Sequence, residues 1–278
     1  MGTKIDGKKL AEGIKEELKR YIEMKNSKTQ IPICMANILV GNDGGSKYYV
    51  NNQNKLCNKL GIKVKSIYLD DTVKEEELLH IINELNKDKE VHGIIIQLPL
   101  PEHLDEAKIT SAIDVNKDID GLSSISVGKL YKGENCFVPC TPRGIIEIIK
   151  SCNVKIEGSN AVVIGRSNIV GRPVAQLLLK ENATVTICHS KTENLKEICS
   201  KADILVAAVG KPKFITKEYV KEGAVVIDVG TSSVEGKLVG DVCFDEVIEK
   251  AGFVTPVPGG VGAMTTTMLI KNLCEGLK

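Results

Sequence analysis

The chain has 278 residues, of which 42% are hydrophobic and 26% charged, and its formal net charge is +1. These values are typical of a soluble globular protein long enough for two separate cores, and they exclude the fibrous and disordered classes. The near-zero net charge gives no overall attraction to nucleic acid or to an anionic membrane, so we predict neither as a partner.

The sequence shows no pattern typical of a targeting signal or of a metal site. No apolar run approaches the roughly 18 residues of a membrane span, and the first residues lack the apolar core of a signal peptide, so the cytoplasm is the default location. The chain has nine cysteines, an odd number with no C-x-x-C pair, which indicates reduced thiols. The four histidines form no i,i+4 pair, and Cys136 with Cys140 has no partner pair, so we predict no metal site.

Helical and strand patterns alternate in the first half of the chain. A stripe of apolar residues predicts a helix over residues 6–24. Strands are predicted over residues 31–40, 62–69 and 92–97. A glycine-rich turn at 41–45, a helix over 46–60 and a helix that Thr72 can cap, running to about residue 85, lie between them. This alternation predicts a parallel sheet flanked by helices.

The second half repeats this alternation after a turn-rich connection at Asp120 and Gly121. In PCTPRG, residues 139–144, Thr141 followed by Pro142 predicts the start of a helix, and we place a domain boundary there. Strands are predicted over residues 161–164, 184–188, 204–209 and 224–229, and a last helix ends near residue 277. The predicted fold class is therefore α/β, with two α/β domains.

The stretch AVVIGRSNIVGRP, residues 161–173, predicts a buried strand, a tight turn at 165–168 and a helix over 169–181. Such a turn presents backbone N–H groups and a helix N-terminus to an anion, which is how a dinucleotide pyrophosphate is held. The spacing from Gly165 to Gly171 does not fit the G-x-G-x-x-G fingerprint. By itself the stretch is equally compatible with an ordinary strand-to-helix crossover.

The end of the second strand of this half predicts which dinucleotide would bind. Enzymes that use NAD usually carry an acid there, but this chain has His189, Ser190 and Lys191. Arg166, just after the first strand, can approach the same place and pair with a 2′-phosphate, which favours NADP. The alternative is that Arg166 is a solvated surface cation.

Glycine-rich segments follow the later strands. Gly210 and Gly230 end the last two predicted strands and should line the cofactor groove, unless each is simply a turn residue. The loop VTPVPGGVGAMT, residues 254–265, would let backbone approach a ligand closely.

Four stretches together resemble the bifunctional methylenetetrahydrofolate dehydrogenase/cyclohydrolase family: SKYYVNNQNK (46–55), GIIIQLPLP (93–101), KDIDG (117–121) and TPVPGGVGAMT (255–265). PCTPRG, GRSNIVGRP and CHSKT are similar to its cofactor half, so the resemblance covers nearly the whole chain. It implies an N-terminal folate/catalytic domain over residues 1–140, to which a last helix, 262–278, returns. It also implies a Rossmann-like NADP-binding domain over 141–261, a folate cleft between the domains and a homodimer.

The predicted chemistry depends on Tyr49, Gln53, Gln97 and Asp120. Tyr49 and residue 53 share a helix face, Gln97 closes a buried strand, and Asp120 in a turn could accept hydrogen bonds from a pterin. Singly, Tyr49, Gln97 and Asp120 could instead be a core residue, a strand-ending polar residue and a turn former. By resemblance, Tyr49 stacks near the folate, Gln97 assists hydrolysis and Asp120 anchors the pterin.

The predicted site is completed by residues from both halves. The further substrate-binding residues are Leu98, Pro99, Pro258, Gly259 and Gly260, and the predicted NADP-binding residues are Thr141, Gly165, Arg166, Ser167, His189, Ser190, Gly210, Gly230 and Thr231.

One position departs from the family pattern S-x-x-Y-V-x-x-K. Aligned through Ser46, Tyr49 and Val50, the pattern has a lysine where this chain has Gln53. Lys55 does not replace it, because two residues of helix turn a side chain by about 200°. Smaller departures are Ala263, Ser126 and the pair Thr231-Ser232.

The departure at Gln53 bears differently on the family's two reactions. Hydride transfer needs alignment and no proton acceptor, whereas hydrolysis needs a group that exchanges protons. We therefore expect NADP-dependent oxidation of 5,10-methylenetetrahydrofolate to the methenyl compound, with weak or absent cyclohydrolase activity. The alternatives are a fully bifunctional enzyme that also forms 10-formyltetrahydrofolate, another NADP-dependent two-domain dehydrogenase, and a non-catalytic dinucleotide-binding protein.

Overall fold

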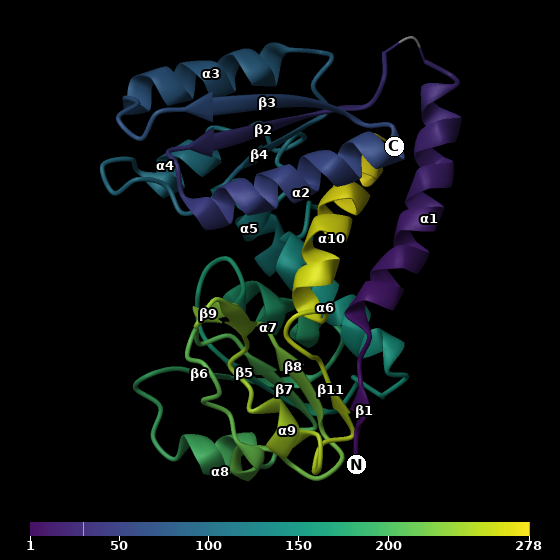
Figure 1. Cartoon of the computed structure of the whole chain (residues 1–278), viewed down its shortest axis with the longest axis vertical. Helices are drawn as coiled ribbons and strands as arrows, with labels where there is room; N and C mark the ends of the chain where they lie inside the picture. The colour runs from purple at the N-terminus through teal and green to yellow at the C-terminus, as the bar shows by residue number, and fades with distance from the viewer. Residues whose placement is uncertain (30, 278) are drawn as a thin grey trace. The chain divides into compact units, whose positions relative to one another are not determined.

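The computed structural model of the chain describes residues 1–29 and 31–277. They form two compact units, which confirms the predicted two-domain α/β class. Unit 1 comprises Met1–Gly13 and Pro139–Met268, and unit 2 comprises Ile14–Val138 and Leu269–Lys278. Two helices, α1 (Gly7–Asn26) and α10 (Val261–Glu275), each have residues in both units (Figure 1).

The compact units differ from the predicted ranges at the chain ends. The prediction grouped residues 1–140 with 262–278, whereas the first 13 residues belong to unit 1 and α10 passes to unit 2 at Leu269. The return of the last helix is held by Asn272, whose Nδ2 donates to the carbonyls of Ile119 (2.7 Å) and Val138 (2.8 Å). Which unit carries which activity stays a prediction.

Unit 2 is built on a parallel sheet with strand order β3-β2-β4. The strands are β2 (Cys34–Val40), β3 (Lys63–Leu69) and β4 (Gly93–Ile96), close to the predicted ranges. Helices α2 (Gly44–Leu60) and α3 (Glu75–Lys87) cover opposite faces of this sheet (Figure 1). Every residue of β2 is buried, because β2 is the central strand.

Several details of unit 2 differ from the prediction. Helix α3 begins at Glu75 and has no side-chain cap, and the hydroxyl of Thr72 donates to Asp70 instead, so the predicted Thr72 cap was wrong. Two short helices, α4 (Glu106–Ser111) and α5 (Ser124–Lys132), follow β4 and were not predicted.

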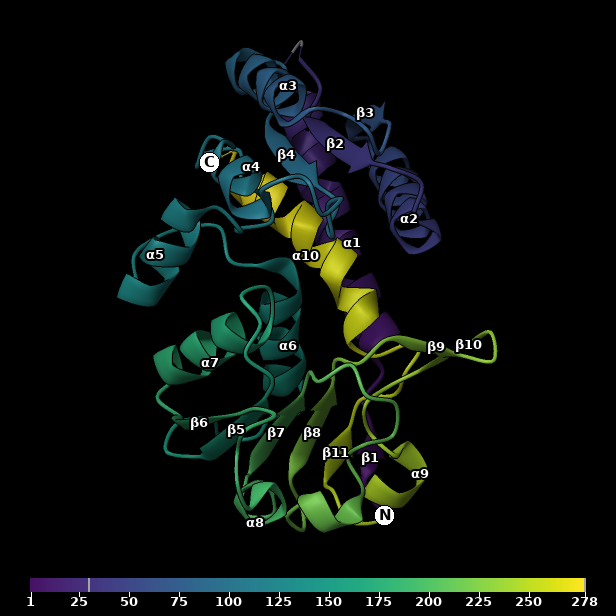
Figure 2. The ribbon, with the colours of Figure 1, turned by 90° about the vertical axis from the view of Figure 1, so that its left-hand side faces the viewer.

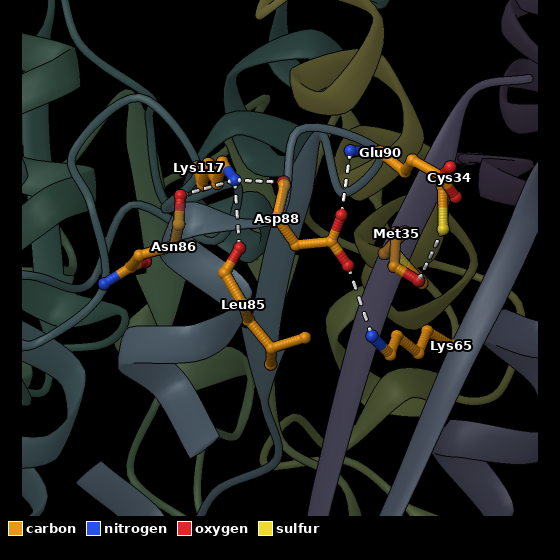
Figure 3. Close-up of polar contacts among 8 residues, drawn as sticks. All are labelled: Cys34, Met35, Lys65, Leu85, Asn86, Asp88, Glu90 and Lys117. Atoms are coloured by element: carbon orange, nitrogen blue, oxygen red, sulfur yellow. Dashed lines mark hydrogen bonds and ion pairs between the residues drawn. The ribbon is translucent and has the colours of Figure 1, made fainter. Parts of the chain in front are cut away.

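Lys117 ties the KDIDG segment to the C-terminal end of α3 (Figure 3). Its Nζ donates to the carbonyl oxygens of Leu85 (2.9 Å), Asn86 (2.8 Å) and Asp88 (2.7 Å). The last carbonyls of a helix have no intrahelical partner, so this ammonium group supplies one. Partial burial lowers the pKa of Lys117. The turn that carries Asp120 is thereby anchored to α3.

Unit 1 contains a parallel sheet with strand order β1-β11-β8-β7-β5-β6. Strand β6 pairs with one side of β5, and β7, followed by β8, lies on the other side. The direction in which successive strands are added therefore reverses between β5 and β7. Figure 2 shows the sheet, whose strands are β1 (Thr3–Lys4), β5 (Asn160–Ile164), β6 (Thr184–Cys188), β7 (Ile204–Ala207), β8 (Val225–Asp228) and β11 (Phe253–Val254).

Helices cover both faces of this sheet, and an antiparallel hairpin extends from it as an arm (Figure 2). Helix α6 begins at Cys140 with Pro139 as its N-cap, so the predicted start at Thr141-Pro142 was wrong by a small shift. The other elements are α7 (Gly171–Lys180), α8 (Leu195–Cys199), a 3-10 turn (Lys217–Tyr219), α9 (Phe244–Val247), and the hairpin strands β9 (Ser232–Val234) and β10 (Lys237–Val239).

No disulfide bond joins any of the nine cysteines, all of which lie in the part of the chain that the structure describes. Within residues 1–29 and 31–277, no helix is both long enough and apolar enough to span a bilayer.

Candidate functional site

Three buried amide side chains meet between the sheet of unit 2 and α2. Asn37 lies on β2, Gln53 on α2 and Gln97 directly after β4, and they are only 1%, 6% and 8% exposed. Successive residues of a strand face opposite sides of the sheet. Ala36 and Ile38 therefore pack in the core with α3, whereas Asn37 faces α2.

The hydrogen bonds among these amides leave little freedom. Asn37 Nδ2 and Gln97 Nε2 both donate to Gln53 Oε1, at 2.8 and 3.0 Å, and Gln97 Nε2 also donates to Asn37 Oδ1 at 3.1 Å. Both lone pairs of the Gln53 oxygen and both N–H bonds of Gln97 are thus used. In the described part of the chain, Gln53 Nε2 and Gln97 Oε1 have no hydrogen-bond partner, so these two groups can face a ligand.

The structure brings Gln53 and Gln97 together by a hydrogen bond, and their catalytic role stays a prediction. Tyr49 lies one helical turn before Gln53 and is 41% exposed, and Asp120 is half-buried in the turn that Lys117 anchors. Leu98 and Pro99 follow Gln97 directly and are joined by a cis peptide bond. Their contacts with substrate stay predictions.

Asn37 was not predicted, although a polar residue in the otherwise apolar run CMANILV was the available signal. A buried amide needs hydrogen-bond partners, and such a residue in a central strand marks a polar site beside it.

Ser126, one of the departures from the family pattern, belongs to a buried polar cluster that shapes the segment after Asp120. Asp118 is 2% exposed, and its Oδ2 accepts from Ser126 Oγ (2.7 Å) and from the backbone N–H of Ser123 (2.9 Å). The hydroxyl of Ser123 caps α5 by accepting from the N–H of Ser126. A serine at position 126 thus completes the link between the KDIDG turn and α5.

In unit 1, the turn after β5 packs backbone against backbone where the strand order reverses. Gly165 has φ +128°, and a Cβ placed on it would lie 2.3 Å from the carbonyl oxygen of Ala208. A Cβ on Gly171 would lie 2.2 Å from the carbonyl oxygen of Gly165. Ligands of open α/β sheets bind at such a reversal. These two glycines therefore let backbone segments approach each other closely, as the glycines of the G-x-G-x-x-G fingerprint do, although their spacing in the sequence differs.

Ser167 organises the start of α7, which begins at Gly171 rather than at the predicted residue 169. Its Oγ accepts hydrogen bonds from the N–H groups of Val170 (3.2 Å) and Gly171 (3.3 Å). Its carbonyl oxygen accepts one from the N–H of Arg172 (3.1 Å). The N–H groups nearest the helix start are thus bonded within the turn. A pyrophosphate would bind the earlier amides of the turn or replace the Ser167 hydroxyl.

Arg166 and Ser190 follow the ends of adjacent strands. Ile164 pairs with Cys188 in the sheet, and the N–H of Gly165 donates to the carbonyl of Cys188 at 2.9 Å. Arg166 and Ser190 are both exposed, so an incoming phosphate can reach them. Contact of either residue with a 2′-phosphate stays a prediction.

The turn after β6 is ordered by hydrogen bonds of its own residues. The N–H of His189 donates to Thr192 Oγ1 (2.8 Å), and His189 Nδ1 accepts from the N–H of Lys191 (3.2 Å). Ser190 is therefore presented from a defined turn.

Two buried carboxyl groups hold the loops that contain Gly210 and Gly230. Asp228 begins the stretch 228–233, predicted to line the cofactor groove, and Asp241 was not predicted. Asp241 Oδ2 accepts from the N–H groups of Val209 (2.6 Å) and Gly210 (3.0 Å). Asp228 Oδ1 accepts from those of Gly230 (3.0 Å) and Asp241 (2.9 Å). Burial raises the pKa of Asp228 to about 6, and the Asp241 charge adds to this effect.

The remaining predicted residues are also in unit 1. The hydroxyl of Thr141 contacts that of Thr265 at 3.0 Å, and Thr231 is exposed just before β9. Pro258 follows a cis peptide bond, and Gly259 has φ +104°. A Cβ on Gly260 would lie 2.6 Å from the carbonyl oxygen of Pro256, so glycine is required there. Among the described residues, no group of three His, Cys, Asp or Glu side chains is placed to hold a metal ion.

Two family models match the chain. Residues 5–120 match the tetrahydrofolate dehydrogenase/cyclohydrolase catalytic domain, and residues 139–278 match the tetrahydrofolate dehydrogenase/cyclohydrolase NAD(P)-binding domain. The chain is 81% identical to the bifunctional protein FolD of Clostridium novyi (strain NT) over 278 residues, which is 100% of both chains.

Solved structures agree with these matches. The bifunctional FolD of Campylobacter jejuni superimposes with a TM-score of 0.97 at 45% identity, covering 99% of this chain and 98% of that one. The methylenetetrahydrofolate dehydrogenase-cyclohydrolase of Trypanosoma brucei, solved with NADP and an inhibitor, gives a TM-score of 0.93 at 38% identity, covering 98% and 96%.

Proposed function

The chain belongs to the tetrahydrofolate dehydrogenase/cyclohydrolase family, and on that premise we propose that it is chiefly a dehydrogenase. It oxidises 5,10-methylenetetrahydrofolate to 5,10-methenyltetrahydrofolate with NADP, and its cyclohydrolase activity is weak or absent. The observation that carries this proposal is the buried, hydrogen-bonded amide of Gln53 at the place of the family's lysine.

Dehydrogenation makes few demands on this site. NADP supplies the hydride acceptor when it is bound, and residues at the ends of β5 and β6, with Gly210 and Gly230, would hold it. The methylene carbon loses hydride with its electron pair, and the adjacent nitrogen stabilises the remaining cation. Gln53 Nε2 and Gln97 Oε1 can orient the folate without moving a proton, so the step needs alignment alone.

Hydrolysis of the methenyl cation is different, because the attacking water must lose a proton. A positioned acid or base contributes about 10² to 10⁴ in rate. An amide orients water through its N–H and C=O groups but does not exchange protons usefully near pH 7. Lys47 and Lys55, the nearest lysines along α2, are both exposed, whereas Gln53 is buried.

One paired assay tests the proposal. Formation of NADPH and the absorbance of the methenyl compound are followed together in the purified enzyme, and we expect the methenyl compound to accumulate. Gln53→Lys should raise hydrolysis while changing dehydrogenation little. A wild-type enzyme that hydrolyses the methenyl compound as fast as it makes it would refute the proposal.

That outcome would favour the alternative, a fully bifunctional enzyme that also forms 10-formyltetrahydrofolate. The naming of the Clostridium novyi relative as bifunctional favours this alternative, and the residue at position 53 opposes it.

We infer further that the enzyme prefers NADP to NAD and acts as a homodimer in the cytoplasm. The exposed Arg166 and Ser190, without an acid beside them at the end of β6, support the cofactor preference. The homodimer rests on the family resemblance, and sedimentation equilibrium tests it by giving either one or two chain masses.

A further inference from the structure

Asn37, on the central strand β2 of unit 2, forms hydrogen bonds with the two other amides of the site. It is 1% exposed, and both ends of its amide are used within the cluster: Nδ2 donates to Gln53 Oε1 and Oδ1 accepts from Gln97 Nε2. Nδ2 also lies 3.4 Å from Asn54 Oδ1, and Asn54 Nδ2 donates to Ser66 Oγ (2.9 Å) on β3. Burying an amide in a strand of apolar residues is unfavourable unless its hydrogen bonds are made.

We propose that Asn37 is a positioning residue that sets the reaction specificity of this site by fixing the amides of Gln53 and Gln97. The inference rests on the proposed function and deepens it, because it adds a second position that decides whether hydrolysis can occur. Asn37 supplies one donor to Gln53 and one acceptor to Gln97, so the outward groups, Gln53 Nε2 and Gln97 Oε1, keep one arrangement toward the folate.

The same contacts determine how a lysine at position 53 would behave. An ammonium group only donates hydrogen bonds, and its tip would lie where Gln53 Oε1 now meets Asn37 and Gln97. Either neighbouring amide can present its oxygen by turning about its last side-chain bond. Two such acceptors favour the charged lysine and raise its pKa, which opposes a role as a base.

An apolar residue at position 37 would remove one of these acceptors. Burial then lowers the pKa of the lysine, and the neutral amine can accept a proton from water. In hydrolysis, the water oxygen bonds to the methenyl carbon and the bond from that carbon to one ring nitrogen breaks. One proton of the water ends on that nitrogen and the other is released to solvent. Residue 37 therefore decides whether a lysine at position 53 can take the first proton.

The test compares three proteins that all carry Gln53→Lys and differ only at residue 37, with Asn37 retained, Asn37→Val or Asn37→Asp. We expect hydrolysis of 5,10-methenyltetrahydrofolate to be fastest with valine, slower with asparagine and slowest with aspartate, by about tenfold at each step. One hydrogen bond to a charged group shifts a pKa by about one unit or more. Equal rates in the three proteins would overturn the inference.

A second measurement separates positioning from a purely structural role. In the background with Gln53, Asn37→Asp keeps the shape of the side chain but replaces its donor. We expect kcat/KM for 5,10-methylenetetrahydrofolate to fall at least tenfold, while the KM for NADP stays the same. Asn58→Asp, at an exposed position of the same helix as Gln53, is the matched control. An Asn37→Asp enzyme with unchanged kcat/KM and only a lower melting temperature would contradict the inference.

The two proposals can fail separately. Rapid hydrolysis by the wild type would refute the proposed function, whereas the order of the three lysine-containing proteins decides the role of Asn37 whatever the wild type does. If Asn37→Val prevents folding, the comparison of asparagine with its isosteric replacement aspartate still decides the order.

Discussion

At the scale of single residues, Asp228 should make the stability of the protein depend on pH in an unusual direction. Burial raises its pKa from 3.8 to about 6, so the folded protein keeps this proton to a higher pH than the unfolded chain. The free energy of unfolding therefore falls as pH rises from about 4 to 6 and is constant for this group above that range. Over about two pKa units the loss is about 3 kcal/mol.

Urea denaturation of the wild type and Asp228→Asn between pH 4 and 7 tests this prediction. The stability advantage of the wild type should be largest near pH 4 and decrease toward pH 6. Asp203→Asn is the control with the opposite sign, since Lys221 and the N–H of Asn160 lower the pKa of Asp203. The advantage of Asp203 should fall as the solution becomes more acidic. A difference for Asp228 that does not vary with pH would contradict the assignment.

Arg166 should carry much of the preference for NADP. A hydrogen bond between a guanidinium and a phosphate contributes about 1.5–3 kcal/mol, which corresponds to at least tenfold discrimination. Arg166→Ala should therefore lower the ratio of kcat/KM for NADP to that for NAD by tenfold or more. Lys180→Ala removes an exposed cation at the far end of α7 and should leave the ratio unchanged. If Arg166→Ala left the ratio of kcat/KM for NADP to that for NAD unchanged, Arg166 would not be the source of the preference for NADP.

The sequence pointed to some of the residues of the candidate site and missed others. Gln53 was singled out by the family pattern and Gln97 by its place at the end of a buried strand, and the structure joins them by a hydrogen bond. Asn37 and Asp241 escaped because their importance lies in contacts between segments far apart in the chain. Local patterns contain no information on which distant amide or N–H group a buried polar residue will meet.

At the scale of secondary-structure elements, the junction of β5 and α7 depends on the absence of side chains at Gly165 and Gly171. A methyl group on Gly165 would clash with the carbonyl oxygen of Ala208 after β7, whereas one on Gly171 would clash with the carbonyl oxygen of Gly165 and push the start of α7 away from the strand end. Gly171→Ala should weaken NADP binding at least tenfold and lower the melting temperature by several degrees.

Gly128→Ala is the matched control for this change. Gly128 lies inside α5, and a Cβ there would meet no atom within 4 Å. This substitution should stabilise the protein by about 0.4–1 kcal/mol through the reduced entropy of the unfolded chain. Isothermal titration with NADP and thermal unfolding measure both variants. If Gly171→Ala still bound NADP tightly, the prediction would be wrong, because α7 could then move away from the end of β5 without loss of binding.

The longer elements were predictable because they contain continuous apolar runs or apolar residues at regular spacing. Strands β2, β3, β5 and β6 match the predicted ranges closely for this reason. Strands β1 and β11 have two residues each, too few for a recognisable pattern. They form by pairing within the sheet, where β11 lies between β8 and the edge strand β1. The predictions that Thr72 caps α3 and that α6 starts at Thr141 were wrong because several neighbouring residues can occupy a helix start.

At the scale of the whole molecule, the predicted NADP contacts all belong to unit 1, so binding should protect that unit first. Amide hydrogen exchange with saturating NADP should slow at residues 165–171, 189–192, 209–210 and 229–231, because a ligand stabilises the state that binds it. Residues 63–69 in unit 2 serve as the internal control and should change little. Protection confined to unit 2 would contradict the assignment of the cofactor site.

The division of the chain also affects how the protein is made. Each compact unit contains residues from near both ends: β1 pairs with β11 across 250 positions, and Asn272 holds Ile119 and Val138. Domains usually fold in turn as they leave the ribosome, at about 5–20 residues per second. Here neither unit can close until the last stretch of the chain has been synthesised. For most of its translation the nascent protein must therefore keep two exposed surfaces from associating with other chains. They are the sheet of unit 1, which lacks β11, and the core of unit 2, which lacks the end of α10.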